Sequence, residues 1–433
     1  MGCGYPRYNY LYRDLPHHPA FAPSKKRLWE KARLFEKNLE LFIAPDGLLV
    51  YYRRDMAQNP GPPRPGSYGN AADGAMWTGV ALGTQALRYA CTKSADALAK
   101  ARKFAQGLHL LQAVTGVKGL LARFYDHGTS PNPSEQGHRA WRQGKGKYWR
   151  YRYRSNPSKD QYAGVLYGYS LAYTWVPPLR EVIRQDVCNI ADHLIKNNYI
   201  LTRANGTATK YGNLQGRIFG IPIGVNALIS LHAITLAAKV NPTKYKPEWR
   251  RLIRYKYHRI ARLSKFSLLG KTNHNNDNMA FLSIYGLLTL LPEGEVRREI
   301  KLAAKALWRF VRGEGNSFWN MMYCGMVERD LQGIRDGIQN LRLFPETLRG
   351  YEVDLRNLAK KGVIEKSCFR NRGGKPISKY ALPVYVRGLN SFAWKACPFA
   401  LYHKEVGDIR FSGLDYLAAY WLGRFHKLIR PTD

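Results

Sequence analysis

Helical periodicity recurs along nearly the whole chain and constrains its fold more than any other feature. Apolar residues fall three or four positions apart, the spacing of one helix face, as in the stripe of Leu28, Ala32, Phe35, Leu39 and Phe42. Short breaks rich in proline or glycine, such as Pro177-Pro178, divide roughly twelve such segments into pairs. Strand-like alternation is brief, with candidates only at 47–52 and 379–386. The sequence therefore predicts an all-α fold of helical hairpins with at most minor β segments.

The length and composition favour one large domain. The 433 residues are 45% hydrophobic and contain no linker that would divide them. We expect an N-terminal extension over residues 1–25 and a single domain over residues 26–433. The longest apolar stretch, 279–291, is shorter than the ~20 residues of a spanning helix, so no membrane span is expected. The first residues lack the apolar core of a signal peptide, so secretion would require that a leader had been removed.

The charge of the chain points to a polyanionic partner. There are 68 Lys and Arg residues against 31 Asp and Glu, a formal net charge of +37. Such a surplus destabilises the compact state unless it is offset, and it concentrates polyanions near the surface. The candidates are an anionic polysaccharide, nucleic acid held through non-specific charge, an anionic membrane surface and an acidic protein. A generally basic proteome is the alternative explanation that needs no partner.

The cysteines indicate neither a metal site nor a cofactor. None of the six has the spacing of a metal-ligand motif. Three lie in apolar helical segments and are expected to be buried free thiols: Cys91, Cys188 and Cys324.

Acidic residues stand at the starts of several expected helices, namely Asp73, Asp160, Asp277 and Asp415. Asp is a preferred N-cap because its oxygens accept unpaired backbone N–H groups, so each residue alone has a structural explanation. In a barrel of hairpins, however, alternate helices begin at the same rim, and carboxylates at those starts converge on one pocket. Glycosidic bond hydrolysis uses two such carboxylates.

Several motifs carry a family resemblance. The segments 74–80 (GAMWTGV), 87–92 (LRYACT), 158–164 (SKDQYAG) and 413–424 (GLDYLAAYWLGR) resemble the six-hairpin glycosidase-like superfamily, in particular its uncharacterised bacterial members. The resemblance implies an (α/α)6 toroid with long basic loops at one rim. It also implies that the Asp160-Gln161 segment faces a pocket, and that 206–212 is an inter-helix turn with a Thr-x-x-Gly pattern.

The chain departs from this family in its charge. It is poor in acids, and its pocket-side segments are flanked by cations: Arg123, Lys159, Arg217 and Lys271. A basic pocket suits a uronate or a sulfated sugar better than a neutral one. We therefore expect a carbohydrate-active toroid that acts on an anionic polysaccharide.

The segment 141–154 (WRQGKGKYWRYRYR) is the densest basic and aromatic run of the chain. It lies within 129–157, which together with 60–70 is expected to be a long functional loop. Arg150 and Arg152 could pair with sulfate or carboxylate groups, and the aromatic rings could stack on sugars or bases. The alternative is a solvated loop whose aromatic side chains attach it to the barrel.

Two chemistries follow for the expected pocket. In hydrolysis, Asp73 and Asp160 form the acid/base pair, with Asp277 as the third candidate, and burial beside Trp77 raises the pKa of the acid. In a lyase, Tyr162 or His274 abstracts the proton next to a uronate carboxylate. Arg123 or Arg217 neutralises that carboxylate, and Gln161 and Trp77 contact the substrate. The alternative function is a non-catalytic structural or binding protein that holds a polyanion or an acidic partner.

Overall fold

The computed structural model describes residues 15–16, 22–68, 73–129, 141–265, 273–347, 352–371, 373–387, 392–404 and 409–433. These residues form fourteen α-helices and thirteen short strands, which confirms the predicted all-α class. The helices are α1 (Leu28–Glu40), α2 (Gly74–Thr92), α3 (Ala95–Ala113), α4 (Lys159–Trp175), α5 (Arg180–Lys196), α6 (Gly224–Val240), α7 (Pro242–Arg254), α8 (Tyr257–Ile260), α9 (His274–Leu290), α10 (Glu295–Val311), α11 (Ser317–Met326), α12 (Leu331–Leu343), α13 (Arg356–Lys360) and α14 (Leu414–Phe425).

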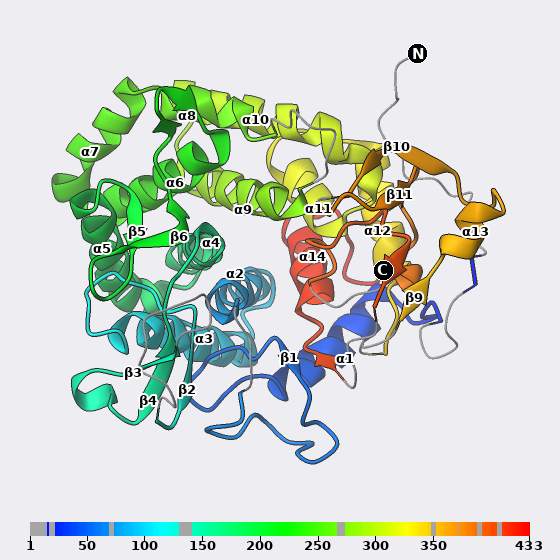
Figure 1. Ribbon diagram of the computed structural model, residues 1–433, viewed down its shortest axis with the longest axis horizontal. Helices are drawn as coiled ribbons and strands as arrows, with labels where there is room; N and C mark the ends of the chain where they lie inside the picture. The colour runs from blue at the N-terminus through cyan, green and yellow to red at the C-terminus, as the bar shows by residue number, and fades with distance from the viewer. Residues whose placement is uncertain are drawn as a thin grey trace.

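Alternate helices build two layers. The inner ring runs α2, α4, α6, α9, α11, α14 and back to α2, and each helix contacts the next. An outer helix packs behind each inner one: α3 on α2, α5 on α4 and α6, α7 on α6, α10 on α9, α12 on α11, and α1 on α14. Figure 1 shows the outer helices surrounding the inner set. This arrangement is the expected (α/α)6 toroid, although α4 also contacts α9, which is not its neighbour in the ring.

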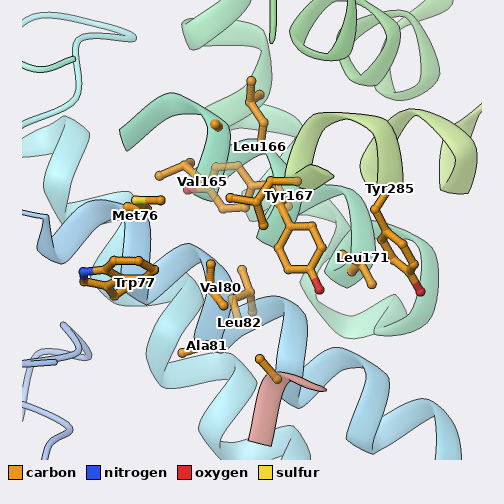
Figure 2. Close-up of a cluster of buried hydrophobic side chains, with 14 of the residues drawn as sticks. Met76, Trp77, Val80, Ala81, Leu82, Val165, Leu166, Tyr167, Leu171 and Tyr285 are labelled. Atoms are coloured by element: carbon orange, nitrogen blue, oxygen red, sulfur yellow. The ribbon is translucent and has the colours of Figure 1, made fainter. Parts of the chain in front are cut away.

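Glycines allow the closest helix pair, α2 and α4, to touch backbone to backbone. A Cβ on Gly79 would lie 2.2 Å from the carbonyl oxygen of Gly164, and one on Gly168 would lie 2.2 Å from that of Gly79. No side chain fits at such a separation. Figure 2 shows the apolar side chains around this crossing, including Met76 and Val80 from α2 and Val165 from α4.

The strands are short and lie in the connections between helices. They are β1 (Tyr52–Arg53), β2 (Phe124–His127), β3 (Trp141–Gln143), β4 (Tyr151–Arg154), β5 (Ile200–Thr202), β6 (Ala208–Asn213), β7 (Arg217–Ile218), β8 (Ile221–Pro222), β9 (Val353–Asp354), β10 (Lys366–Arg370), β11 (Pro376–Ser378), β12 (Tyr402–His403) and β13 (Arg410–Phe411).

Three sequence expectations about these connections were wrong. The basic and aromatic run expected to be a loop forms β3 and β4, which join β2 in a three-stranded antiparallel sheet. The Thr-x-x-Gly segment 206–212, expected to be a turn, belongs largely to β6, which pairs with β5. Segment 379–386 holds a 3-10 turn at Val384–Val386 instead of a strand. Long amphipathic side chains such as Tyr and Arg conceal the alternation of strands, because both faces of such a strand look polar in the sequence.

The three helical cysteines are free thiols, but only Cys324 is buried; Cys188 is half-buried and Cys91 is exposed. In the described part of the chain, no helix combines the length and the apolar character that crossing a membrane requires.

Candidate functional site

The N-termini of the inner helices meet at one rim of the toroid. At the start of α4, Nε2 of Gln161 donates to Oδ1 of Asp73, which immediately precedes α2, over 3.0 Å. On the other side of α4, Nζ of Lys159 donates to Oδ1 of Asn226 in α6 over 3.0 Å. Nζ of Lys395 lies 3.3 Å from Oδ2 of Asp73. The dipoles of these helices favour negative charge at this rim.

Asp73 is held by side chains and does not cap its helix. Its carboxylate makes no cap hydrogen bond, but it accepts from Nη2 of Arg123 at 3.0 Å as well as from Gln161 and Lys395. Burial opposes ionisation of this carboxyl, but Lys395 and Arg123 outweigh it, so the pKa of Asp73 lies below its usual range. Asp73 is therefore suited to act as a carboxylate base or nucleophile and not as a proton donor.

The other two candidate carboxylates have different surroundings. Asp160, in the first turn of α4, accepts from Ser158 Oγ at 3.3 Å through Oδ2. Its Oδ1 is buried and has no hydrogen-bond partner among the described residues. Asp277, in the first turn of α9, is 1% exposed and forms an ion pair with Lys265. Burial raises the pKa of Asp277 although Lys265 opposes this shift. Asp277 therefore lies beneath the surface at the start of α9.

A pocket opens at this rim beside α9. It has a volume of about 190 Å³ and is lined by Asn273, His274, Asn275, Asn371, Gly373, Lys395 and Cys397. Its walls thus carry an imidazole, an ammonium group and several amides, a set that can bind the hydroxyl and carboxylate groups of one sugar unit. The described residues contain no group of three or more His, Cys, Asp or Glu side chains that could hold a metal ion.

His274 in this pocket is backed by a buried carboxylate. Its Nε2 lies 3.0 Å from Oε2 of Glu314, and both side chains are only 4% exposed. The ring also lies parallel to Trp319, with centroids 6.1 Å apart. A carboxylate bound to one ring nitrogen fixes the orientation and the tautomer of the imidazole, so that the other nitrogen can exchange a proton with a ligand.

The loop 392–397 places Lys395 between Asp73 and the pocket. Phe392 stacks on Trp77 of α2 with centroids 4.7 Å apart. Nε1 of Trp394 donates to the backbone oxygen of Asp415 over 2.6 Å, and Oδ2 of Asp415 accepts from the backbone N–H of residue 393 over 3.1 Å. Asp415 therefore anchors this loop. Trp77 is 5% exposed and is stacked between Tyr51 and Phe392, so it supports the rim from within the core.

Tyr162, a predicted proton acceptor, lies in the core. It is fully buried, donates to the carbonyl oxygen of Gly119 at 3.3 Å and accepts from the backbone N–H of Leu121 at 3.4 Å. Burial raises the pKa of its hydroxyl well above the usual range. This placement does not support proton abstraction by Tyr162.

The predicted cations do not share one set of contacts. Arg123 is in the Asp73 network, whereas Arg217 is exposed in β7 and donates to the carbonyl oxygen of Gly220 at 3.3 Å. Arg152 lies over the ring of Trp141 at 4.7 Å and bonds to Asp126 at 3.4 Å. Arg150 is exposed and lies over its neighbour Trp149 at 5.1 Å. Lys271 lies outside the described residues.

Sequence reasoning missed Lys395, Glu314 and Lys265. Glu314 had a weak signal, because this acidic residue stands between Gly313 and Gly315, three residues before an inner helix. Lys395 had none, because it reaches the rim from a loop more than three hundred residues away from Asp73 in the sequence.

Comparison with known proteins gives distant structural matches only. No protein-family model matches the sequence, and no curated protein matches it. Among solved structures, the cellulase Cel9M of C. cellulolyticum overlaps 92% of this chain and 98% of its own, at 10% identity and a TM-score of 0.39. A metagenome-derived family 9 endoglucanase overlaps 92% of this chain and 80% of its own, at 13% identity and a TM-score of 0.41. A family 76 mannosidase from Bacteroides thetaiotaomicron overlaps 93% of this chain and 98% of its own, at 12% identity and a TM-score of 0.42. These likenesses do not carry a substrate or a mechanism over to this chain.

Proposed function

We propose that this protein is a carbohydrate-active toroid that cleaves an anionic, uronate-containing polysaccharide by elimination at the pocket beside α9. The observation that carries this proposal is the pairing of His274 with buried Glu314 on a pocket wall that also holds Lys395. A base and a nearby cation are the two groups that elimination next to a carboxylate requires.

The proposed chemistry is a β-elimination. His274 removes the proton from the carbon next to the uronate carboxylate, while Lys395 stabilises the negative charge that develops on that carboxylate. The electron pair of the broken C–H bond forms the new C=C bond, and the adjacent glycosidic C–O bond breaks. The leaving oxygen takes up a proton from solvent. Glu314 stabilises the imidazolium that forms on His274.

Hydrolysis is the second candidate, and Asp160 is the observation that favours it. Asp73 has the lowered pKa expected of a base or nucleophile, and Asp160 offers a buried carboxylate oxygen that has no partner among the described residues. Ser158 and Gln161 connect the two residues through hydrogen bonds. These two carboxylates would serve as base and acid on a glycosidic bond.

The test is turnover of a panel of uronate-containing and sulfated polysaccharides by the wild type and two variants. Unsaturated uronate ends are followed by ultraviolet absorbance, and new reducing ends by a colorimetric assay. We expect unsaturated product from the wild type, and a loss of about 10²–10⁴-fold in His274→Ala with much smaller loss in Asp160→Asn. If Asp160→Asn abolishes cleavage and His274→Ala does not, the hydrolytic candidate is correct. Binding without any cleavage would instead identify a non-catalytic binding protein.

A further inference from the structure

A β-hairpin at the pocket rim presents two apolar side chains to solvent. Strands β7 and β8 pair through Arg217 with Pro222 and Ile218 with Ile221, which leaves a two-residue turn at Phe219-Gly220. The side chain of Phe219 is 100% exposed and that of Ile221 is 63% exposed. Exposure of large apolar side chains to water is unfavourable in free energy, so a tip of this kind indicates a surface that becomes covered.

The backbone of the turn adds to this indication. Phe219 has a φ of +49° and Gly220 a φ of +79°. Two-residue hairpin turns of this type favour Asn or Asp before Gly, because a bulky side chain is strained at positive φ. Phe219 therefore occupies a position where the backbone conformation alone would favour a small polar residue. This indicates that the aromatic ring serves a function other than stabilising the fold.

The stretch of sequence that contains the hairpin is basic. A single acidic residue, Glu248, occurs between Asp192 and Asp277, and its carboxylate is occupied by Arg251 and Tyr199. Exposed cations in the same stretch include Lys210, Arg217, Arg254 and Lys256.

The start of α8 lies against the base of the hairpin. The hydroxyl of Tyr257 accepts from the backbone N–H of Gly216 over 3.1 Å. Two residues earlier, the side chain of Tyr255 is 55% exposed between Arg254 and Lys256. We call Arg217, Phe219, Ile221, Arg254, Tyr255 and Lys256 the hairpin patch.

We propose that the hairpin patch docks the protein on an anionic lipid surface. Apolar and aromatic side chains at a tip enter the boundary between headgroups and acyl chains, while surrounding Lys and Arg residues are attracted to anionic lipids. The hairpin leads directly into α6, where Nδ2 of Asn226 donates to the backbone oxygen of Gln215 over 3.0 Å. Docking therefore brings the rim that carries the pocket towards the membrane.

The chemistry of the patch favours lipid over a glycan chain. A sugar-stacking platform needs a ring whose orientation is fixed before binding, because fixing it afterwards costs entropy. The side chain of Phe219 is fully exposed, so no described residue packs against its ring and orients it. Ile221 offers no flat face for a sugar at all. Insertion into lipid needs neither a fixed orientation nor a flat face.

The test is co-sedimentation of the full-length protein with vesicles of phosphatidylglycerol and phosphatidylcholine, compared with phosphatidylcholine alone. The hairpin variant is Phe219→Asn with Ile221→Thr, because Asn suits the positive φ and Thr suits a strand, so the fold is retained. The matched control changes two exposed apolar residues elsewhere, Leu331→Ala and Val363→Ala.

We expect the wild type to bind the anionic vesicles, to bind the neutral ones more weakly and to lose binding as salt rises. The hairpin variant should bind on the order of tenfold more weakly or worse, while the control and His274→Ala bind like the wild type. The proposal is wrong if the wild type does not bind anionic vesicles, or if the hairpin variant binds as well as the control. Loss of binding to a soluble acidic glycan, with vesicle binding unchanged, would make the hairpin a glycan contact and would equally overturn it.

Discussion

Removing the Lys395 ammonium tests the network that forms the pocket rim. Lys395→Met keeps most of the side-chain volume and leaves Asp73 with two partners among the described residues, Arg123 and Gln161. The side chains of Lys395 and Asp73 are 12% and 29% exposed, and Nζ of Lys395 is 3.3 Å from Oδ2 of Asp73. The strength of this pair is therefore intermediate between that of a surface pair, worth ~0–1 kcal/mol, and that of a buried pair, whose disruption costs ~3–5 kcal/mol. We expect a loss of about 1–3 kcal/mol in the free energy of unfolding at pH 7.

The loss in the free energy of unfolding caused by Lys395→Met should be larger at neutral pH than in acid. The pKa of Asp73 is lowered in the folded protein, so its contribution is present above the unfolded pKa of ~4 and is lost as pH falls through the folded value. The gap between wild type and Lys395→Met should therefore be largest near neutral pH and shrink in acid.

The assay is urea unfolding followed by circular dichroism, in a double-mutant cycle with Asp73→Asn. Lys404→Met is the control, because Lys404 is exposed and its removal should change the stability by less than about 0.5 kcal/mol. The Lys395–Asp73 pair does not stabilise the rim if the effects of Lys395→Met and Asp73→Asn on stability are additive within ~0.5 kcal/mol. The same conclusion follows if the stability difference between wild type and Lys395→Met is equal at neutral and acid pH.

Further predictions address the core, the pocket and the charged surface. Gly79→Ala should destabilise the protein by about 1–3 kcal/mol despite the better helix propensity of Ala, because its Cβ would overlap the Gly164 carbonyl; an unchanged or higher melting temperature would contradict the close packing of α2 on α4. Glu314→Gln should lower kcat by about a hundredfold and shift its pH profile, since the charge that stabilises the His274 imidazolium is lost; an unchanged profile would remove Glu314 from the mechanism. Arg150→Ala should reduce the salt dependence of polyanion binding by about one counterion, as measured by titration at several salt concentrations, and an unchanged slope would mean that this exposed cation does not face the ligand.

The helical architecture could be predicted from the sequence because it depends on local patterns, namely the spacing of apolar residues and the residues that begin helices. The stripe beginning at Leu28 and the acidic starts at Asp73, Asp160 and Asp277 each correspond to a helix that lies where the pattern indicated. The alternation of inner and outer layers follows once the helices are paired by short connections.

Some residues of the candidate site could not be predicted from the sequence, because they come from connections distant along the chain. Lys395 and Glu314 reach the rim through tertiary contacts that leave no periodic trace. Tyr162 was predicted on the pocket side of α4, but it is buried in the core. An inner helix is apolar nearly all round, so its sequence does not distinguish the face towards the pocket from the face towards the outer layer.

The most direct test of the proposed function is mass spectrometry of the products formed in water enriched in heavy oxygen. Elimination breaks the glycosidic bond without adding water, so we predict products one water lighter than the hydrolytic ones and free of label. One heavy oxygen per cleaved bond would contradict the His274 mechanism and support hydrolysis by Asp73 and Asp160.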